Sequence, residues 1–469
     1  MPTIIDVLLE SQPESLELLR QRVQALARKE DPKLKGIASF VRLQAIPQLH
    51  FVSMQIFEDG HFDPLLVFEN NFDGSPDAYW QSVLSDKSLS DDLRAIFACT
   101  KQAKLDAWDK LFASGNTDSL APFLEAHSCR PSAQHFGAVA NSLARIQRDR
   151  GIFNDIQTEL GVTAAKYRSL NAPKVQAALR TWALTKYGSP SWITQPEWPT
   201  TAQAISAYKW SAWQPALPGL IALIVGIAIL LSASFSSYLP DHGHLGFRLV
   251  LRTLLVIGLL ALPCIVLIFW KSLRRLEETD FTQDNPQLSL AQMKLFASEE
   301  DQIVQNHLAS LVIVKPGAVR AILIRVSLRL LKFGVPLVAW NGYLGSMRTI
   351  HFAHWTLVGN SGRLLFLSNF DGSWQSYLDD FVDKAAHGLT LAWGNCVGFP
   401  RTQDLILQGA AHGTEFKAWA RQSQTQSILW YSAYSDLTVN QIIRNASIVD
   451  GLRKTSMQET EAEQWAQLL

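Results

Sequence analysis

The sequence predicts an α+β membrane protein in which two similar modules are separated by a pair of membrane-spanning helices. Two observations lead to this fold class. A five-residue string begins at Asn71 and begins again at Asn369, in segments that share one order of strand-like and helix-like patterns. Between the two copies lie two long runs without charged residues, which are typical of transmembrane helices.

The repeated string is Asn-Phe-Asp-Gly-Ser, at 71–75 and at 369–373. In both copies it follows two short apolar runs separated by a turn, and the first run opens with a His-Phe pair at His50 or His351. An identical string in a matched context indicates an internal duplication, so each half is expected to contain a similar module.

The second copy carries the clearer pattern of secondary structure. Its periodicity predicts strands at 308–314, 349–358, 363–368 and 390–393, and helices at 318–333 and 374–385, followed by C-terminal helices. The order β-α-β-β-α-β is the ferredoxin-like plan. In the first copy the opening strand is predicted at 36–43, without a recognisable first helix before Leu49.

These patterns divide the chain into five regions. They are a first ferredoxin-like module at 1–100, a helical insert and linker at 101–199, a membrane hairpin at 200–276, a second ferredoxin-like module at 277–403, and C-terminal helices at 404–469.

The hairpin is predicted to cross the membrane twice, at about 217–239 and 249–270, with a turn at 240–244. A buried helical hairpin in a soluble core is the alternative. Two spans return the chain to its starting side, so both modules share one compartment. The cations that flank the hairpin on the module side outnumber those at the turn and favour a cytoplasmic location; they are Lys209, Lys271, Arg274 and Arg275, against Arg248 and Arg252.

Composition excludes several functional classes. The 469 residues include 42 Lys plus Arg and 42 Asp plus Glu, so no net charge attracts nucleic acid. The four cysteines are far apart and lack the spacing of a metal site or of a disulfide framework, so no metal is predicted. Residues 1–28 lack the apolar core of a signal peptide and are expected to belong to the mature protein.

Two residues are candidates for chemistry. Alternation along the predicted strand places His354 on one face with Phe352 and Thr356, a mixture that suits a cavity wall, so His354 could act as a ligand or an acid–base group. A hydrogen-bonded structural histidine is the alternative. Asp371 in the repeated string could transfer a proton, but Asp-Gly also suits a tight turn, and Ser373 can cap the following helix.

A third candidate is a basic helix at 318–333. Arg325, Arg329 and Lys332 cluster on one side of this helix, next to a broad apolar face. Such a helix could lie at a bilayer surface with its cations near anionic headgroups. Alternatively, it is a module helix that packs on its sheet and exposes a solvated basic edge.

The second half resembles an uncharacterised family of bacterial membrane proteins, through residues 350–355, 368–373 and 377–381. Two paired ferredoxin-like modules are also similar to the dimeric α+β barrel superfamily, which includes dye-decolourising peroxidases and chlorite dismutases. This resemblance implies an intramolecular α+β barrel and haem as a possible cofactor. Where those peroxidases carry the first glycine of a Gly-x-x-Asp-Gly motif, this chain has Asn70 or Ser368.

Two functional hypotheses follow. In the first, a membrane-anchored barrel without a catalytic motif binds a hydrophobic small molecule, a lipid or a partner protein, with Arg325, Arg329 and Lys332 at the headgroups. In the second, the barrel is a haem-dependent, peroxidase-like oxidoreductase that uses His354 and Asp371. Whether the protein is an enzyme is left open by the sequence.

Overall fold

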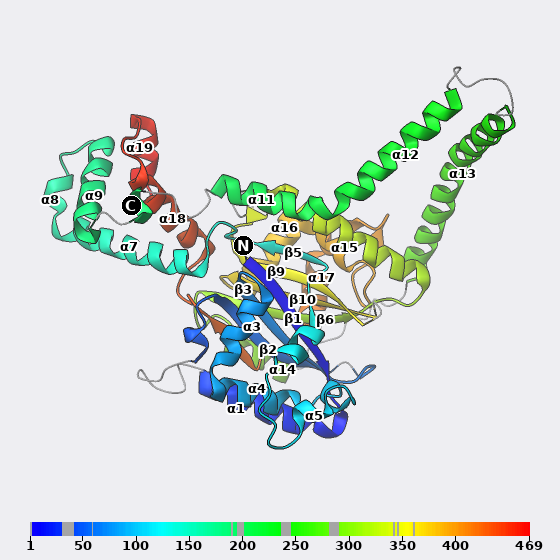
Figure 1. Cartoon of the computed structure of the whole chain (residues 1–469), viewed down its shortest axis with the longest axis horizontal. Helices are drawn as coiled ribbons and strands as arrows, with labels where there is room; N and C mark the ends of the chain where they lie inside the picture. Colours follow the sequence, from blue (N-terminus) through cyan, green and yellow to red (C-terminus); the bar gives the residue numbers. More distant parts are fainter. Residues whose placement is uncertain are drawn as a thin grey trace.

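The computed structural model describes the chain except residues 1, 31–41, 59, 189–190, 195–200, 236–244, 281–289, 341–342, 345–346 and 360–361. The protein is α+β, as predicted: antiparallel sheets form its centre and helices cover them (Figure 1). We call residues 2–162 the first half and residues 305–453 the second half.

Each half contributes three long strands to a sheet of its own. The first sheet has the order β13-β2-β3-β1-β4 and the second has the order β5-β9-β10-β6. The strands of the first sheet are β1 Pro2–Glu10, β2 Leu49–Phe57, β3 Leu65–Asp73, β4 Ser128–Cys129 and β13 Leu429–Ser432. Those of the second are β5 Ala133–Phe136, β6 Gln305–Ile313, β9 Ile350–Val358 and β10 Arg363–Asp371.

The two sheets are joined by segments that pair with both of them. Cys129 pairs with Asp6 of β1, and the chain then continues into β5, which pairs with β9 of the other sheet. In the second half, Gln424 bridges Ser310 of β6 before β13 pairs with β2. The sheets therefore enclose a common interior, and the crossing segments supply hydrogen-bond partners to β1 and β2 of one sheet and to β6 and β9 of the other.

Helices cover the outer face of each sheet. The first sheet packs under α1 Leu16–Glu30, α3 Pro76–Ser85, α4 Lys87–Phe97 and α6 Ala121–His127, and the second packs under α15 Ala318–Val338, α16 Trp374–Trp393 and α17 Gly413–Gln422. The predicted alternation holds, because Val52 and Met54 lie in the core beneath the helices of the first sheet. Ala353 and Trp355 do the same in the second.

The first half begins differently from the prediction. Its first strand is β1 at Pro2–Glu10, followed by α1, whereas the predicted strand at 36–43 lies mostly outside the described residues and Arg42–Ala45 form a 3-10 turn. Strand β1 is buried on both faces, so its apolar residues form a nearly continuous run that periodicity does not separate from a helix.

The last predicted strand of the second module is also wrong. Residues 390–393 form the final turn of α16, where Trp393 packs among core aromatic residues. The segment beside β6 in that role is the one at Gln424, which bridges Ser310, and β13 follows it and pairs with β2 of the first sheet; both lie within the region predicted as C-terminal helices, 404–469. Likewise, β4 and β5 lie within the predicted helical insert at 101–199. These three strands are two to four residues long, too short to show a period.

Two helices project from the body of the protein (Figure 1): α12 Leu217–Phe235 and α13 Leu245–Glu278. Among the described residues, one helical stretch, Ala202–Ala228, is long and apolar enough to cross a membrane. A second stretch of that kind is not found there, so the predicted pair of spans at 217–239 and 249–270 is not confirmed. The predicted turn at 240–244 lies outside the described residues.

A separate helical arm extends from the other side of the body (Figure 1). Its core joins α7 Leu143–Val162 of the first half and α18 Val439–Arg453 of the second half to α9 Ala172–Tyr187 and α19 Glu459–Ala466, which lie outside both halves. Buried Arg145 of α7 reaches both oxygens of Asp450 of α18, each at 3.0 Å, and so links the two halves in this arm.

Candidate functional site

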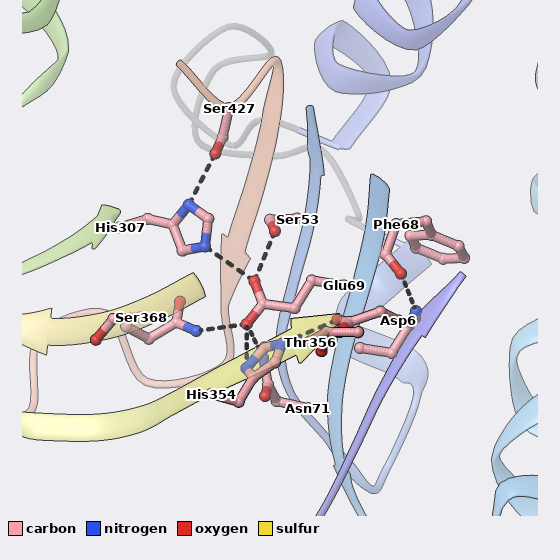
Figure 2. Close-up of polar contacts among 12 residues, drawn as sticks. Asp6, Ser53, Phe68, Glu69, Asn71, His307, His354, Thr356, Ser368 and Ser427 are labelled. Carbon is pink, nitrogen blue, oxygen red and sulfur yellow. Dashed lines mark hydrogen bonds and ion pairs between the residues drawn. The ribbon is translucent and has the colours of Figure 1, made fainter. Parts of the chain in front are cut away.

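The interior between the sheets is layered. One end is apolar, and its residues are Phe57, Leu65, Val67, Ala309, Leu311, Val358, Leu365 and Leu367. The other end is rich in aromatic residues, among them Phe51, Phe136, Phe352 and Tyr434. Between these two layers lies a buried polar network, and His354 is at its centre (Figure 2).

His354 forms an ion pair with an aspartate from the other half. Its Nε2 lies 3.0 Å from both carboxylate oxygens of Asp6, and the hydroxyl of Thr356 donates to Asp6 Oδ2 at 2.7 Å. All three side chains are buried, with exposed fractions of 0–2%. The strand alternation therefore places His354 on the inner face as predicted, against a partner that the sequence did not indicate.

Glu69 is the second anionic centre of the network. Its carboxylate accepts hydrogen bonds from Ser53 at 2.6 Å, Asn71 at 2.8 Å and Asn369 at 3.2 Å. Nε2 of His307 lies 2.9 Å from Glu69 Oε2 (Figure 2). These contacts satisfy the lone pairs that burial would otherwise leave without partners.

The network holds both of its charge types inside the protein. Burial alone would raise the pKa of Glu69, but His307, His354 and Asn71 outweigh it and lower that pKa to about 2. Burial would lower the pKa of His354, but the charges of Asp6 and Glu69 outweigh it and raise that pKa. The network thus favours the carboxylate form of Glu69 and the imidazolium form of His354 more than water does.

The charges of the network come from different halves. Asp6 and Glu69 belong to the first half, and His307 and His354 belong to the second. The repeated string sets the equivalent positions. When the two copies of the string are aligned, Leu367 of the second half takes the position of Glu69. Ala309 takes the position of Asp6, because Ala309 pairs with Leu367 as Asp6 pairs with Glu69.

This network is packed too closely to hold haem. Nε2 of His354 is paired with Asp6, and the ring is fully buried. His354 is therefore not open to a bond with a haem iron. A neighbouring cavity lined by His50, His351 and Tyr434 measures about 10 Å³, room for a single water molecule. In the described part of the chain no group of three His, Cys, Asp or Glu residues could hold a metal ion.

Asp371 lies outside this network, at the mouth of the interior. Its Oδ1 is 2.7 Å from Nε2 of His351, and its Oδ2 accepts the backbone N–H of Val439, the first residue of α18, at 2.7 Å. Asp371 and His354 are therefore not brought together in one site. The carboxylate compensates the unpaired N–H groups of a helix N-terminus.

The first copy of the string has the same arrangement. Asp73 Oδ2 lies 3.0 Å from Nε2 of His50 and accepts the N–H of Leu143, the first residue of α7, at 2.7 Å. Gly74 and Gly372 have φ of 94° and 79°, as the predicted tight turn requires. The following serines, Ser75 and Ser373, cap α3 and α16.

The sequence missed four residues of these sites: Asp6, Glu69, His307 and Tyr434. Asp6 was hidden because β1 was not predicted. Glu69 did carry a signal, since it is an ionisable residue inside an apolar run, between Phe68 and the repeated string. Tyr434, whose hydroxyl lies 2.9 Å from Nδ1 of His50, had none, because its segment was predicted to be helical.

The basic helix is α15. Arg325, Arg329 and Lys332 are exposed, as predicted. The predicted apolar face is divided: Leu331 packs in the core of the second sheet and Leu323 is buried, whereas three residues that the same face was predicted to contain are exposed by 42–55%. These are Ile322, Val326 and Leu330.

Comparison of the chain with family models, curated proteins and solved structures finds no match. The resemblance to dye-decolourising peroxidases therefore stays a prediction, and function has to be argued from the geometry.

Proposed function

We propose that this protein is a membrane-anchored, non-enzymatic α+β protein that binds anionic lipid at the bilayer surface through α15. In this proposal α12 and α13 are the two spans, and the remainder of the chain lies in the cytoplasm. The described apolar side chains of both helices support the anchor, because they are exposed from Leu220 to Ile227 and from Val256 to Trp270.

The observation that carries the proposal is the exposed face of α15. Ile322, Val326 and Leu330 form an apolar stripe that no described element covers, and Arg325 and Arg329 flank it. A stripe of this composition matches the boundary between headgroups and acyl chains, where apolar residues enter and cations stay at the phosphates. Each cation near an anionic surface contributes about 1 kcal/mol.

The same helix lies next to the proposed anchor. Trp213, at the end of α11 Thr201–Trp213, packs on Phe333 of α15 with ring centroids 5.2 Å apart. Only the short turn Gln214–Ala216 separates Trp213 from the apolar run of α12. Tryptophan at this height is typical of the membrane interface, so α15 is held at the level where headgroups are expected.

We further propose that the two halves are copies of one ferredoxin-like module that pair as an intramolecular α+β barrel. Matching contacts support this. Phe72 stacks on Tyr79 with centroids 3.9 Å apart, and Phe370 stacks on Tyr377 at the same distance. Both strings end β3 or β10 and are followed by a serine-capped helix.

A lipid surface is favoured over an enclosed ligand. The polar network fills the middle of the interior, and the cavity beside it is of water size. A hydrophobic small molecule or haem would have to displace buried ion pairs, which is costly. No specific observation favours the peroxidase hypothesis.

The experiment is a depth measurement on the full-length chain in nanodiscs. A nitroxide is attached at Leu330→Cys, with exposed Cys264 replaced by alanine. We expect the label to be more accessible to oxygen than to a water-soluble nickel chelate, and expect this preference to weaken when anionic lipid is omitted or salt is raised.

A matched control is a label at Leu18→Cys. Leu18 is 46% exposed on α1, on the side of the body away from α12 and α13 (Figure 1). This label should be accessible to the chelate in every nanodisc. Equal chelate accessibility at positions 18 and 330 would refute contact between α15 and the bilayer.

A further inference from the structure

The cytoplasmic end of α13 holds a β-hairpin against the second half. Glu277 is only 4% exposed, and its carboxylate accepts three hydrogen bonds: from Thr402 Oγ1 at 2.9 Å, Asp404 N at 2.9 Å and Leu405 N at 2.8 Å. The hairpin consists of β11 Thr402–Gln403 and β12 Leu407–Gln408. A buried glutamate with three donors fixes this loop to the helix.

The loop adopts backbone conformations that side chains rarely take. Asp404, Leu405 and Gln408 have φ of 49°, 69° and 59°. Positive φ at such residues is uncommon and persists where surrounding contacts enforce it. Its tip presents two large apolar residues to the outside, Ile406 at 42% and Leu407 at 40% exposure.

The height of the loop relative to the proposed bilayer is marked by Trp270. The indole N–H of Trp270, the last residue before the cations that follow the apolar run, donates to Asp404 Oδ1 at 3.1 Å. A tryptophan at the end of a span lies at the headgroup level. The hairpin tip, with Ile406 and Leu407, is therefore positioned at the surface of the membrane.

Between the helix end and the hairpin lies a cavity of about 230 Å³. Its lining is polar: Arg274, Glu277, Glu278, Arg401, Thr402, Gln403 and Gln408. The lining has two guanidinium and two carboxylate groups, so a ligand that carries both charges matches it better than a simple anion. Arg274 forms ion pairs with Glu278 at 4.0 Å and with Asp404 at 3.7 Å. In the described part of the chain the Arg401 guanidinium has no hydrogen-bond or ion-pair partner, so it is available to a ligand.

We propose that this cavity binds the headgroup of a zwitterionic phospholipid with a primary ammonium, such as phosphatidylethanolamine. Arg401 pairs with the phosphate, because guanidinium and phosphate form two parallel hydrogen bonds. Glu278 accepts from the ammonium, and Ile406 and Leu407 contact the acyl chains. The inference rests on the proposed function, since it requires α13 to cross the bilayer.

The experiment is native mass spectrometry of the full-length chain, purified in detergent and incubated with phosphatidylethanolamine or phosphatidylglycerol. We expect preferential retention of phosphatidylethanolamine. Arg401→Gln should weaken its retention about tenfold, because a charge-assisted contact to the phosphate is lost. Glu278→Gln should remove the preference between the two lipids.

Three controls make the outcomes distinguishable. Arg168→Gln removes an exposed arginine from the helical arm and should leave retention unchanged. Circular dichroism and melting of Arg401→Gln should match the unmodified chain, because Arg401 is exposed. Soluble glycerophosphoethanolamine tests whether the cavity binds a free headgroup instead of a lipid. If it is retained as strongly as the lipid, and Ile406→Ser/Leu407→Ser does not weaken retention of the lipid, the lipid assignment is overturned.

Equal retention of phosphatidylethanolamine by the unmodified chain and by Arg401→Gln would overturn the site itself. The proposed function fails separately. The depth measurement at Leu330 reports the contact between α15 and the bilayer, whereas the mass spectra report the cavity at Arg401. Either result can be negative while the other is positive.

Discussion

Two buried sets of histidines and carboxylates occupy the interior, and they differ in symmetry. At its mouth, His50 with Asp73 and His351 with Asp371 form matching pairs, each at the N-terminus of a helix. At its centre, the carboxylates come from one half and the histidines from the other. One set is duplicated, and the other is complementary.

The difference follows from where each set is located. Each pair at the mouth joins a histidine and a carboxylate of the same half, so each charge has its partner within its own half, although both histidines line one small cavity with Tyr434. At the centre the halves face each other, and two copies of the first half would place Asp6 and Glu69 against the same carboxylates. Like charges in a buried site oppose ionisation. If the halves are copies of one module, as proposed, the central residues had to diverge before their charges became complementary.

The largest predicted effect tests that complementarity. Asp6→Ala introduces the residue found at the equivalent position of the second half, which is Ala309. It also leaves His354 without its main partner. We expect a loss of about 3–5 kcal/mol in the free energy of unfolding, measured by denaturant titration in detergent. His354→Ser, which copies the equivalent Ser53, should cost a similar amount.

The double variant decides the interpretation. If the two residues act as a pair, Asp6→Ala/His354→Ser loses less stability than the sum of the single variants, by about 1–3 kcal/mol. Additive losses would mean that each side chain is stabilised by the rest of the network, and the complementary pairing of the halves would be wrong.

The second prediction concerns the duplicated pairs. Asp73→Ala and Asp371→Ala should each cost about 2 kcal/mol, since each loses an anion at a helix N-terminus and the partner of a buried histidine. Hydrogen exchange should increase at the start of α7 in the first variant and at the start of α18 in the second.

The matched control is Asp383→Ala, an exposed aspartate of α16 outside these pairs, with an expected change within about 0.5 kcal/mol. Faster exchange at both helices in both variants would show that the two pairs act together, through the cavity that His50, His351 and Tyr434 line, and would contradict independent caps.

The sequence was informative where one element faces one environment. The second-half strands at Ile350–Val358 and Arg363–Asp371 alternate between helix-covered and interior faces, and their predicted positions agree with the structure. Strand β1 was not predicted because both of its faces are buried, and β5 and β13 were not predicted because they are short. Crossing from one sheet to the other is a long-range pairing that no local period encodes.

The candidate residues show the same limit. The inner-face position of His354 followed from alternation, but its partner Asp6 lies 348 residues earlier in the chain. For Asp371 the turn-and-cap interpretation was available from the repeated string, because that string contains all the residues of the turn. What the string did not contain was the helix that Asp371 caps, α18, whose first residue is Val439.

The smallest predicted effect is a pH dependence to which the central network contributes at both its acidic and its alkaline end. The pKa of His354 is raised above 6.5 in the folded protein, so its contribution is complete below pH 6.5 and is lost as pH rises through the folded pKa. The pKa of Glu69 is lowered from 4.5 to about 2, so its contribution is complete above pH 4.5 and is lost as pH falls toward 2. Between these limits both contributions are present, and melting temperature should be highest there.

The Asp6→Ala/His354→Ser variant retains Glu69 and His307, so it should keep the loss of stability at acidic pH and show much less of the loss at alkaline pH. An alkaline decline of the same size in that variant would assign it to groups outside the network, because the paired charges of Asp6 and His354 would then be absent.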